Sequence, residues 1–168
     1  MTLLHWPYFC EENIWHLCGN EEALASTSPH LRRVLIISNA RRRVAFRKQH
    51  AGQGGMVFWD YHVVLLAGRQ VWDLDSTLGH PVDLDVWIRE SFYPLVPGCA
   101  PRFRVLEVPT YRSSFASDRS HMRDALGAPL KPMPPWPPIG VGMTLRSLID
   151  LDQPFPGEVV DLAGLRPL

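Results

Sequence analysis

Two neighbouring segments rich in β-branched and aromatic residues constrain the fold of this chain more than any other feature. The segments 56–66 and 70–75 are rich in Val, Leu, Trp and Tyr, and only Ala67-Gly68-Arg69 separates them. Such a composition around a short connection that contains glycine predicts two antiparallel strands joined by a tight turn. We therefore expect this hairpin to lie at the centre of the molecule.

Further strands are predicted at shorter apolar runs on either side of the hairpin. They are rich in β-branched or alternating apolar residues and cover 34–37, 44–46 and 103–108. The three arginines from Arg41 to Arg43 predict a solvated tight turn that joins the first two of these strands. The polar segment 111–123 predicts a loop with a short helical turn. The sequence thus predicts a largely antiparallel sheet.

Helical spacing of apolar residues indicates that helices accompany this sheet. The pattern predicts helices over 10–25, over 83–92 and over 144–149, the last capped by Thr144. Six prolines within the segment 129–138 exclude a regular helix or central strand there and favour extended polyproline geometry. A helix followed mostly by hairpin-linked strands predicts an α+β domain, in which an antiparallel sheet packs against helices.

Length and composition restrict the class of protein. The chain has 168 residues, of which 46% are hydrophobic, 10% aromatic and 20% charged, as is typical of one folded domain that needs neither a metal nor disulfides for stability. We therefore expect residues 1–168 to form a single domain. Lys plus Arg and Asp plus Glu number 17 each, so the formal charge of zero provides no general attraction to nucleic acid or to an anionic membrane.

Cysteine usage and the start of the chain predict a cytoplasmic protein. No apolar run reaches about 18 residues, and the first residues lack the cationic segment and long apolar core of a secretory signal. The three cysteines, Cys10, Cys18 and Cys99, are odd in number and no pair has CxxC spacing. Each is therefore expected to be a free thiol.

A histidine and two acids lie on the central hairpin at positions that bring them together. Alternation places His62 on one face of the first strand, and Asp73 and Asp75 share a face of the second. A turn centred on Ala67-Gly68 sets His62 opposite Asp73, whereas a turn centred on Gly68-Arg69 sets His62 opposite Asp75. Either register gives the imidazole a carboxylate partner, which fixes its tautomer and stabilises its charged form.

Cys10 is the candidate nucleophile for such a pair. Pro7 marks the approach to the first predicted helix, so Cys10 lies at or near the N-terminus of that helix. The helix dipole and a nearby imidazolium are expected to lower the thiol pKa. The order Cys, His, Asp along the chain is that of papain-like and transglutaminase-like thiol enzymes, in which a helix carries the cysteine and the sheet carries the other two groups.

The other cysteines and most histidines have simpler interpretations. Cys18 fits a buried apolar position, and Cys99 fits an incidental thiol in a Pro-Gly loop. Five histidines have no acid or cysteine at an informative spacing and are interpreted as surface residues: His5, His16, His30, His50 and His80. His121 is left open. No spacing of cysteine and histidine matches a zinc motif, so no metal and no cofactor is expected.

Four sequence blocks are specific enough to indicate a family. They are 9–15 (FCEENIW), 59–66 (WDYHVVLL), 72–75 (WDLD) and 115–122 (FASDRSHM). Taken in this order, they resemble the protein N-terminal glutamine amidohydrolases. The resemblance implies an enzyme of the N-degron pathway that deamidates an N-terminal glutamine to glutamate, with a three-layer α/β fold related to transglutaminases. It also implies that Cys10 is the nucleophile, His62 the base and Asp73 the orienting acid.

The implied mechanism follows from these three groups. The thiolate of Cys10 attacks the side-chain amide carbon, His62 delivers a proton to the departing ammonia, and water then hydrolyses the thioester. Backbone N–H groups near the start of the helix are expected to hold the oxyanion. Recognition of a free N-terminus requires an acid near the cleft, for which Asp60, Asp118 and Glu11 are the candidates. The expected partners are peptides or proteins that begin with Gln, bound by a monomer.

Two other functions fit the same residues. The triad could act on an internal glutamine, a peptide bond or another acyl group, because related thiol folds support all of these reactions. The chain could instead be a non-enzymatic interaction domain whose segment 129–138 binds an aromatic groove of a partner. A strap of this segment over the domain's own surface is the simpler interpretation.

Overall fold

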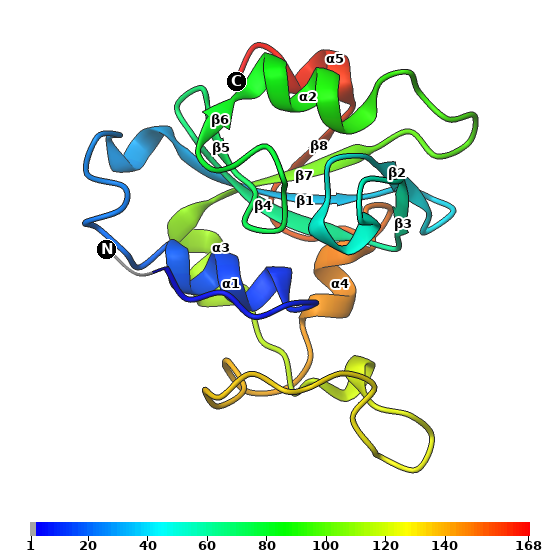
Figure 1. The fold of residues 1–168 in the computed structure, drawn as a ribbon. Helices are drawn as coiled ribbons and strands as arrows, with labels where there is room; N and C mark the ends of the chain where they lie inside the picture. Colours follow the sequence, from blue (N-terminus) through cyan, green and yellow to red (C-terminus); the bar gives the residue numbers. More distant parts are fainter. Residues whose placement is uncertain (1–2) are drawn as a thin grey trace.

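A six-stranded antiparallel sheet forms the middle layer of the molecule (Figure 1). The computed structural model describes residues 3–168, and Met1 and Thr2 lie outside the described residues. The strand order is β6-β5-β4-β1-β7-β8, with β1 (Arg32–Ser38), β4 (His62–Ala67), β5 (Gln70–Trp72), β6 (Val82–Asp83), β7 (Arg102–Glu107) and β8 (Glu158–Val160). A small separate sheet pairs β2 (Val44–Phe46) with β3 (Val57–Trp59).

Helices cover both faces of the central sheet (Figure 1). One face is covered by α1 (Cys10–Leu17), α3 (Val108–Ser114) and α4 (Leu145–Ile149), and the other by α2 (Leu84–Phe92) and α5 (Leu162–Leu165). Successive residues of β1 alternate between two apolar cores, since Val34 and Ile36 belong to one and Leu35 and Ile37 to the other. The expected arrangement of three layers around a largely antiparallel sheet is confirmed.

The central hairpin is confirmed as β4 and β5. Leu65 lies opposite Trp72 and Ala67 opposite Gln70, so the turn is centred on Gly68 and Arg69. Gly68 has a φ of 59°, the left-handed conformation that this turn requires at its first central position and that glycine adopts without strain. The pairing ends at Trp72, so the acids that follow lie beyond the ladder and their positions depend on the next turn.

The prediction that the strands at 34–37 and 44–46 form a hairpin is wrong. β1 and β2 do not pair, because both edges of β1 are occupied by β4 and β7, and β2 pairs with β3 instead. The predicted strand 56–66 is likewise two strands. The chain bends at Asp60, whose carbonyl accepts a hydrogen bond from Ser38 Oγ at 2.7 Å, and passes there from the small sheet to the central one.

The first predicted helix is shorter than expected, whereas the second has the expected extent. α1 ends at Leu17 rather than near residue 25, because Gly19 and Asn20 disfavour helix and the chain continues in turns. Leu24 nevertheless fills the same core as α1. α2 is confirmed, and the Asp83 carboxylate caps it by accepting two backbone N–H groups of its first turn.

The later helices were predicted less well. α3 begins directly after β7, with Pro109 in its first turn, where the polar composition predicted mostly loop. α4 is confirmed, but Thr144 does not cap it. The Thr144 hydroxyl donates to the Ser114 carbonyl at 2.6 Å and accepts from the Ala116 N–H at 2.7 Å, so it fastens the end of α3 to the start of α4. β8 and α5 were not predicted.

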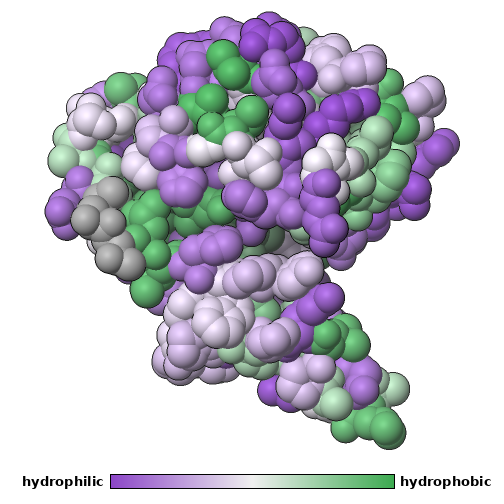
Figure 2. Space-filling model, in the orientation of Figure 1, coloured by the Kyte–Doolittle hydropathy of each residue, from purple (hydrophilic) through white to green (hydrophobic). Residues whose placement is uncertain are grey.

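The Pro-rich segment 129–138 is extended and contains no helix or strand, as predicted. Together with the loop before it, it projects from the body of the molecule (Figures 1 and 2). Two indoles fasten it to the body: Trp6 Nε1 donates to the Pro132 carbonyl at 2.8 Å, and Trp136 Nε1 donates to Glu12 Oε2 at 2.6 Å. Within residues 3–168, no helix is long and apolar enough to cross a membrane.

Candidate active site

A cavity of about 490 Å³ lies beside the N-terminus of α1 and the first residues of β4. Segments that are distant in the sequence meet around it: the chain before α1, the bend between β3 and β4, the 3-10 turn at Ser120–Met122, and α4. The polar side chains of its lining include those of Cys10, His62, Asp75, His5, Tyr61 and His121. The fold therefore brings the predicted thiol and imidazole to one cavity.

Cys10 is the first residue of α1, and 9% of its surface is exposed. Its Sγ donates to Glu11 Oε2 at 3.5 Å. Burial raises the pKa of the Cys10 thiol well above its usual value, and the carboxylates of Glu11 and Asp75 raise it further, although the Val63 backbone opposes them. The expected lowering of this pKa is therefore wrong for the free protein, because desolvation and two carboxylates outweigh the dipole of a short helix.

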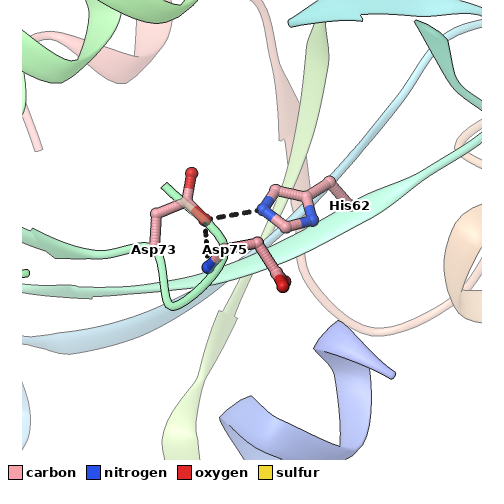
Figure 3. Close-up of side chains that lie close together, drawn as sticks. All are labelled: His62, Asp73 and Asp75. Carbon is pink, nitrogen blue, oxygen red and sulfur yellow. Dashed lines mark hydrogen bonds and ion pairs between the residues drawn. The ribbon is translucent and has the colours of Figure 1, made fainter. Parts of the chain in front are cut away.

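His62 and Asp73 form a buried pair (Figure 3). Nε2 of His62 donates to Asp73 Oδ1 at 2.8 Å. Burial alone would lower the pKa of His62, but the charge and hydrogen bond of Asp73 raise it above its ordinary value. Since Nε2 faces the carboxylate, Nδ1 is the nitrogen that remains free to accept a proton, and Figure 3 shows it on the side of the ring away from Asp73.

The carboxylate of Asp73 is held by four donors. Besides His62, the backbone N–H of Asp75 donates to Oδ1 at 3.2 Å, while Gln49 Nε2 and Trp87 Nε1 donate to Oδ2 at 3.0 and 3.1 Å. Burial alone would raise the pKa of Asp73, but the interactions with His62, Gln49 and Trp87 lower it below its ordinary value. Sequence reasoning missed Gln49 and Trp87, which carry no motif and lie 24 and 14 residues from Asp73.

A second group of polar side chains surrounds Glu11, the residue that accepts the hydrogen bond of Cys10. Tyr61 OH donates to Glu11 Oε2 at 3.0 Å, and His121 Nε2 lies 3.3 Å from the same hydroxyl and 3.5 Å from Glu11 Oε1. Glu11 is completely buried. His121, which the sequence left open, therefore belongs to the surroundings of the thiol.

The three acids predicted to bind a substrate ammonium occupy different environments. Asp60 is exposed and lines the cavity, and its Oδ1 accepts the backbone N–H of Tyr61 at 3.0 Å. Asp118 is exposed and is not among the cavity-lining residues; its Oδ1 accepts the N–H of Ser120 at 2.8 Å. Glu11 is not among the cavity-lining residues and reaches the site through its contacts with Cys10, Tyr61 and His121.

Two histidines interpreted as surface residues, His5 and His50, are exposed as expected and also line the cavity. His5 Nε2 donates to Asp75 Oδ1 at 2.9 Å, and His50 lies in the turn that follows β2. The expectation that His5 has no acidic partner is wrong, because a partner 70 residues away leaves no signal in local spacing.

One group of side chains has metal-ligand types in close proximity. Among residues 3–168, ligand atoms of His62, Asp73 and Asp75 lie within 4.8 Å of one another. The hydrogen bond between His62 Nε2 and Asp73 Oδ1 already uses one atom of each of two members. The geometry thus favours a hydrogen-bonded imidazole and carboxylate.

The fold and the site together define a candidate enzyme of the thiol-dependent type. A buried thiol at the start of a helix and a sheet-borne imidazole with an orienting carboxylate open onto one cavity. These are the groups that nucleophilic catalysis at an acyl carbon requires. The class still leaves the substrate open, because the same groups serve several acyl substrates.

Comparison with known proteins assigns the chain to a family. The model of the N-terminal glutamine amidase family matches residues 5–166, and the chain belongs to this family of enzymes. The protein N-terminal glutamine amidohydrolase of Homo sapiens is 38% identical over 159 residues, which cover 86% of this chain and 76% of the relative. The Arabidopsis thaliana protein of the same name is 36% identical over 149 residues, covering 80% and 67%.

Proposed function

We propose that this protein hydrolyses the side-chain amide of an N-terminal glutamine, which releases ammonia and leaves a glutamate at the N-terminus of the peptide or protein. The observation that carries the proposal is the His62–Asp73 pair, which shares a cavity with Cys10 in a chain whose relatives bear the name N-terminal glutamine amidohydrolase. We assign Cys10 as nucleophile, His62 as general acid and base, and Asp73 as the group that orients His62.

The first half of the reaction forms a thioester. Nδ1 of His62 accepts the thiol proton as Sγ of Cys10 attacks the side-chain amide carbon, and the amide oxygen becomes an oxyanion. The first N–H groups of α1, which a helix leaves without internal partners, are suited to stabilise this charge. The imidazolium returns its proton to the amide nitrogen, the C–N bond breaks, and ammonia leaves.

The second half regenerates the free protein. Nδ1 of His62 accepts a proton from water, and the hydroxide formed adds to the thioester carbonyl. The C–S bond then breaks, the proton returns to the sulfur of Cys10, and the peptide leaves with a glutamate at its N-terminus. Asp73 stays ionised throughout and stabilises the imidazolium that forms in each half.

The raised pKa of Cys10 determines when the proton moves. In the free protein the thiol holds its proton and donates a hydrogen bond to Glu11. The thiolate is therefore formed as the substrate reacts, with His62 as the acceptor. Because the thiolate is the form that oxidants attack, this order of events protects the buried sulfur from solvent oxidants between turnovers.

We further propose that residues 1–168 act as one catalytic domain, monomeric and cytoplasmic, of the papain-like or transglutaminase-like group of thiol hydrolases. Three observations support this: two apolar cores share one sheet, α1 carries the thiol while β4 carries the imidazole, and all three cysteines are free.

Ammonia release from matched peptides tests the proposed function. We expect release from a peptide that begins with Gln, and none when the peptide begins with Asn or acetyl-Gln or carries Gln only internally. Cys10→Ala should reduce the rate by more than about a thousandfold, because the covalent step is lost. Cys99→Ala, a change at a buried thiol away from the cavity lining, is the matched control and should retain activity.

Each alternative result points to a different conclusion. Release from acetyl-Gln or internal Gln would replace the proposed substrate by a general glutamine side chain. Absence of release from every peptide by folded protein would refute the proposed function and favour an interaction domain. Full activity of Cys10→Ala would refute the assignment of the nucleophile.

A further inference from the structure

An imidazole and a carboxylate already meet inside the candidate active site. His5 Nε2 donates to Asp75 Oδ1 at 2.9 Å, with 36% of the His5 side chain and 19% of the Asp75 side chain exposed. The hydrogen bond to Asp75 raises the pKa of His5, and the charge of Asp75 adds to this against the effect of burial. In the free protein, the Asp75 carboxylate therefore holds a hydrogen-bond donor of the protein itself and favours the charged form of that donor.

The position of Asp75 suits the amino end of the proposed substrate. Its carboxylate lies within 4.8 Å of a ring nitrogen of His62, and both residues line the cavity that contains Cys10. In glutamine, four bonds separate the α-nitrogen from the amide carbon, a span on the order of 5 Å. An amide carbon at the sulfur of Cys10 thus leaves the α-ammonium within reach of a carboxylate placed beside His62.

The other acids near the cavity are less suitable for this task. Asp73 has four donors, and Glu11 is completely buried and accepts from Tyr61 and Cys10. Asp60 is exposed to solvent, where an ion pair contributes little. Among residues 3–168, His5 is the only hydrogen-bond partner of the Asp75 carboxylate, so this acid has one exchangeable cation and free acceptor positions.

Building on the proposed function, we propose that Asp75 binds the α-ammonium of the N-terminal glutamine and that His5 occupies this position in the free protein. The substrate ammonium replaces the His5 imidazolium on the same carboxylate. The carboxylate thus keeps a cation at every stage, while an acetylated N-terminus, which has no charge, cannot replace His5. This exchange gives the site its preference for a free amino group.

The chain around His5 fits an exchange of side chains rather than of a whole segment. The next residue, Trp6, is fixed to α1 by two hydrogen bonds: its N–H donates to Asn13 Oδ1 at 2.8 Å, and its carbonyl accepts from Asn13 Nδ2 at 2.9 Å. The Trp6 indole is also bonded to Pro132. The backbone therefore stays in place while the half-exposed imidazole turns away.

Peptide binding, measured without turnover, tests the proposal. The full chain with Cys10→Ala is titrated by calorimetry with a Gln-initiated peptide and with its acetylated form, alone and combined with a second substitution. Asp75→Asn should weaken binding of the free-amine peptide about tenfold or more and leave the acetylated peptide unchanged, because a charge-assisted hydrogen bond is lost. Asp152→Asn, a surface carboxylate paired with Arg102, should change neither.

His5 requires its own variant. His5→Gln keeps a hydrogen-bond donor but removes the charge, so the free-amine peptide should bind several-fold more tightly and the acetylated peptide as before. His30→Gln, an exposed histidine outside the cavity lining, is the matched control. If His5 merely held Asp75 in position, His5→Gln would instead weaken binding as Asp75→Asn does, and the proposed exchange would be overturned.

Further outcomes decide between the acids and between the two proposals. Loss of the free-amine preference in Asp60→Asn or Glu11→Gln, but not in Asp75→Asn, would assign the subsite to another acid. Ammonia release by the otherwise unchanged chain is measured in parallel. Release that occurs while Asp75→Asn keeps the full preference refutes only the subsite, whereas absence of release from every peptide refutes the proposed function itself.

Discussion

Two opposing electrostatic effects act on the protonation of the Cys10 thiol. A helix N-terminus favours an anion by about 0.3–1 kcal/mol, whereas burial of a charge without a partner costs several kcal/mol. The carboxylate of Glu11 would repel a thiolate at Cys10, whereas its Oε2 accepts a hydrogen bond from the neutral thiol at 3.5 Å. The thiol form therefore prevails, as the raised pKa of Cys10 reflects.

This balance predicts the effect of Glu11→Gln on the thiol. Removing the carboxylate charge should lower the pKa of Cys10, so that alkylation by iodoacetamide becomes faster near neutral pH and its pH profile shifts to lower values. The rate of Cys10 modification, followed by mass spectrometry from pH 6 to pH 10, measures this shift. Glu22→Gln, an exposed acid beyond α1, serves as control, and a profile that stays in place or moves upward would contradict the argument.

The sequence predicted the residues of the pair more easily than their contact. Strand alternation placed His62 opposite either Asp73 or Asp75 on the next strand, but the ladder ends at Trp72. Asp73 reaches His62 because the chain turns after β5 and four donors fix the carboxylate there. Such a turn, like the pairing of His5 with Asp75, depends on tertiary packing, which local patterns do not record.

At the scale of elements, α1 is anchored by three consecutive polar residues that are completely buried. Glu11 contacts Tyr61 of the bend before β4, Glu12 contacts the chain around the Pro-rich segment, and Asn13 contacts the backbone of Trp6. From helical periodicity, adjacent acids in the first turn are predicted to be exposed to solvent and stabilised by the helix dipole. The sequence therefore predicted the helix but not that its polar residues face inward.

The ion pair of Glu12 and Arg119 should govern the attachment of the Pro-rich segment. Arg119 Nε and Nη2 donate to the two Glu12 oxygens at 2.8 and 2.7 Å, and Trp136 donates to the same carboxylate. Glu12→Gln leaves a buried guanidinium without its counter-charge and should lower the free energy of unfolding by about 3–5 kcal/mol. Urea denaturation measures the change.

Two controls accompany this variant. Asp152→Asn removes an exposed ion pair with Arg102 and should cost less than about 1 kcal/mol. The double change Glu12→Gln with Arg119→Met should recover part of the loss, because no unpaired charge then remains. A loss from Glu12→Gln no larger than that from Asp152→Asn would show that the buried pair does not hold the segment.

At the scale of the molecule, the same carboxylate links the chemistry to the stability of the layers. Asp73 follows β5 and is bonded to the connection between β2 and β3 through Gln49 and to α2 through Trp87. The antiparallel sheet with helices packed against it was predicted from the apolar patterns of the chain, and its three-layer arrangement from the family resemblance. The partition of strands between two sheets was not, since it depends on which edges of β1 are occupied.

Stability should decline in acid in a way that depends on Asp73. Its pKa is lowered in the folded protein relative to about 3.9 in the unfolded chain, so its contribution is present above that pH and is lost as the pH falls through the folded value. In Asp73→Asn, the free energy of unfolding should be smaller at pH 7 and fall less steeply below about pH 4. Urea denaturation between pH 2.5 and pH 7 provides the comparison, and an equally steep decline in the variant would contradict it.

The indole of Trp87 lies in the apolar core of α2, yet its N–H reaches the carboxylate that orients His62. Substitution of this tryptophan by an apolar residue of similar size would satisfy packing but remove one of the two donors to Oδ2 of Asp73. Tolerance to mutation in the α2 layer would therefore be set by the proposed catalysis as well as by side-chain volume. The residues found at this position in homologous chains would therefore reflect selection for enzyme activity. For a buried tryptophan in an apolar core, selection for folding alone would otherwise be assumed.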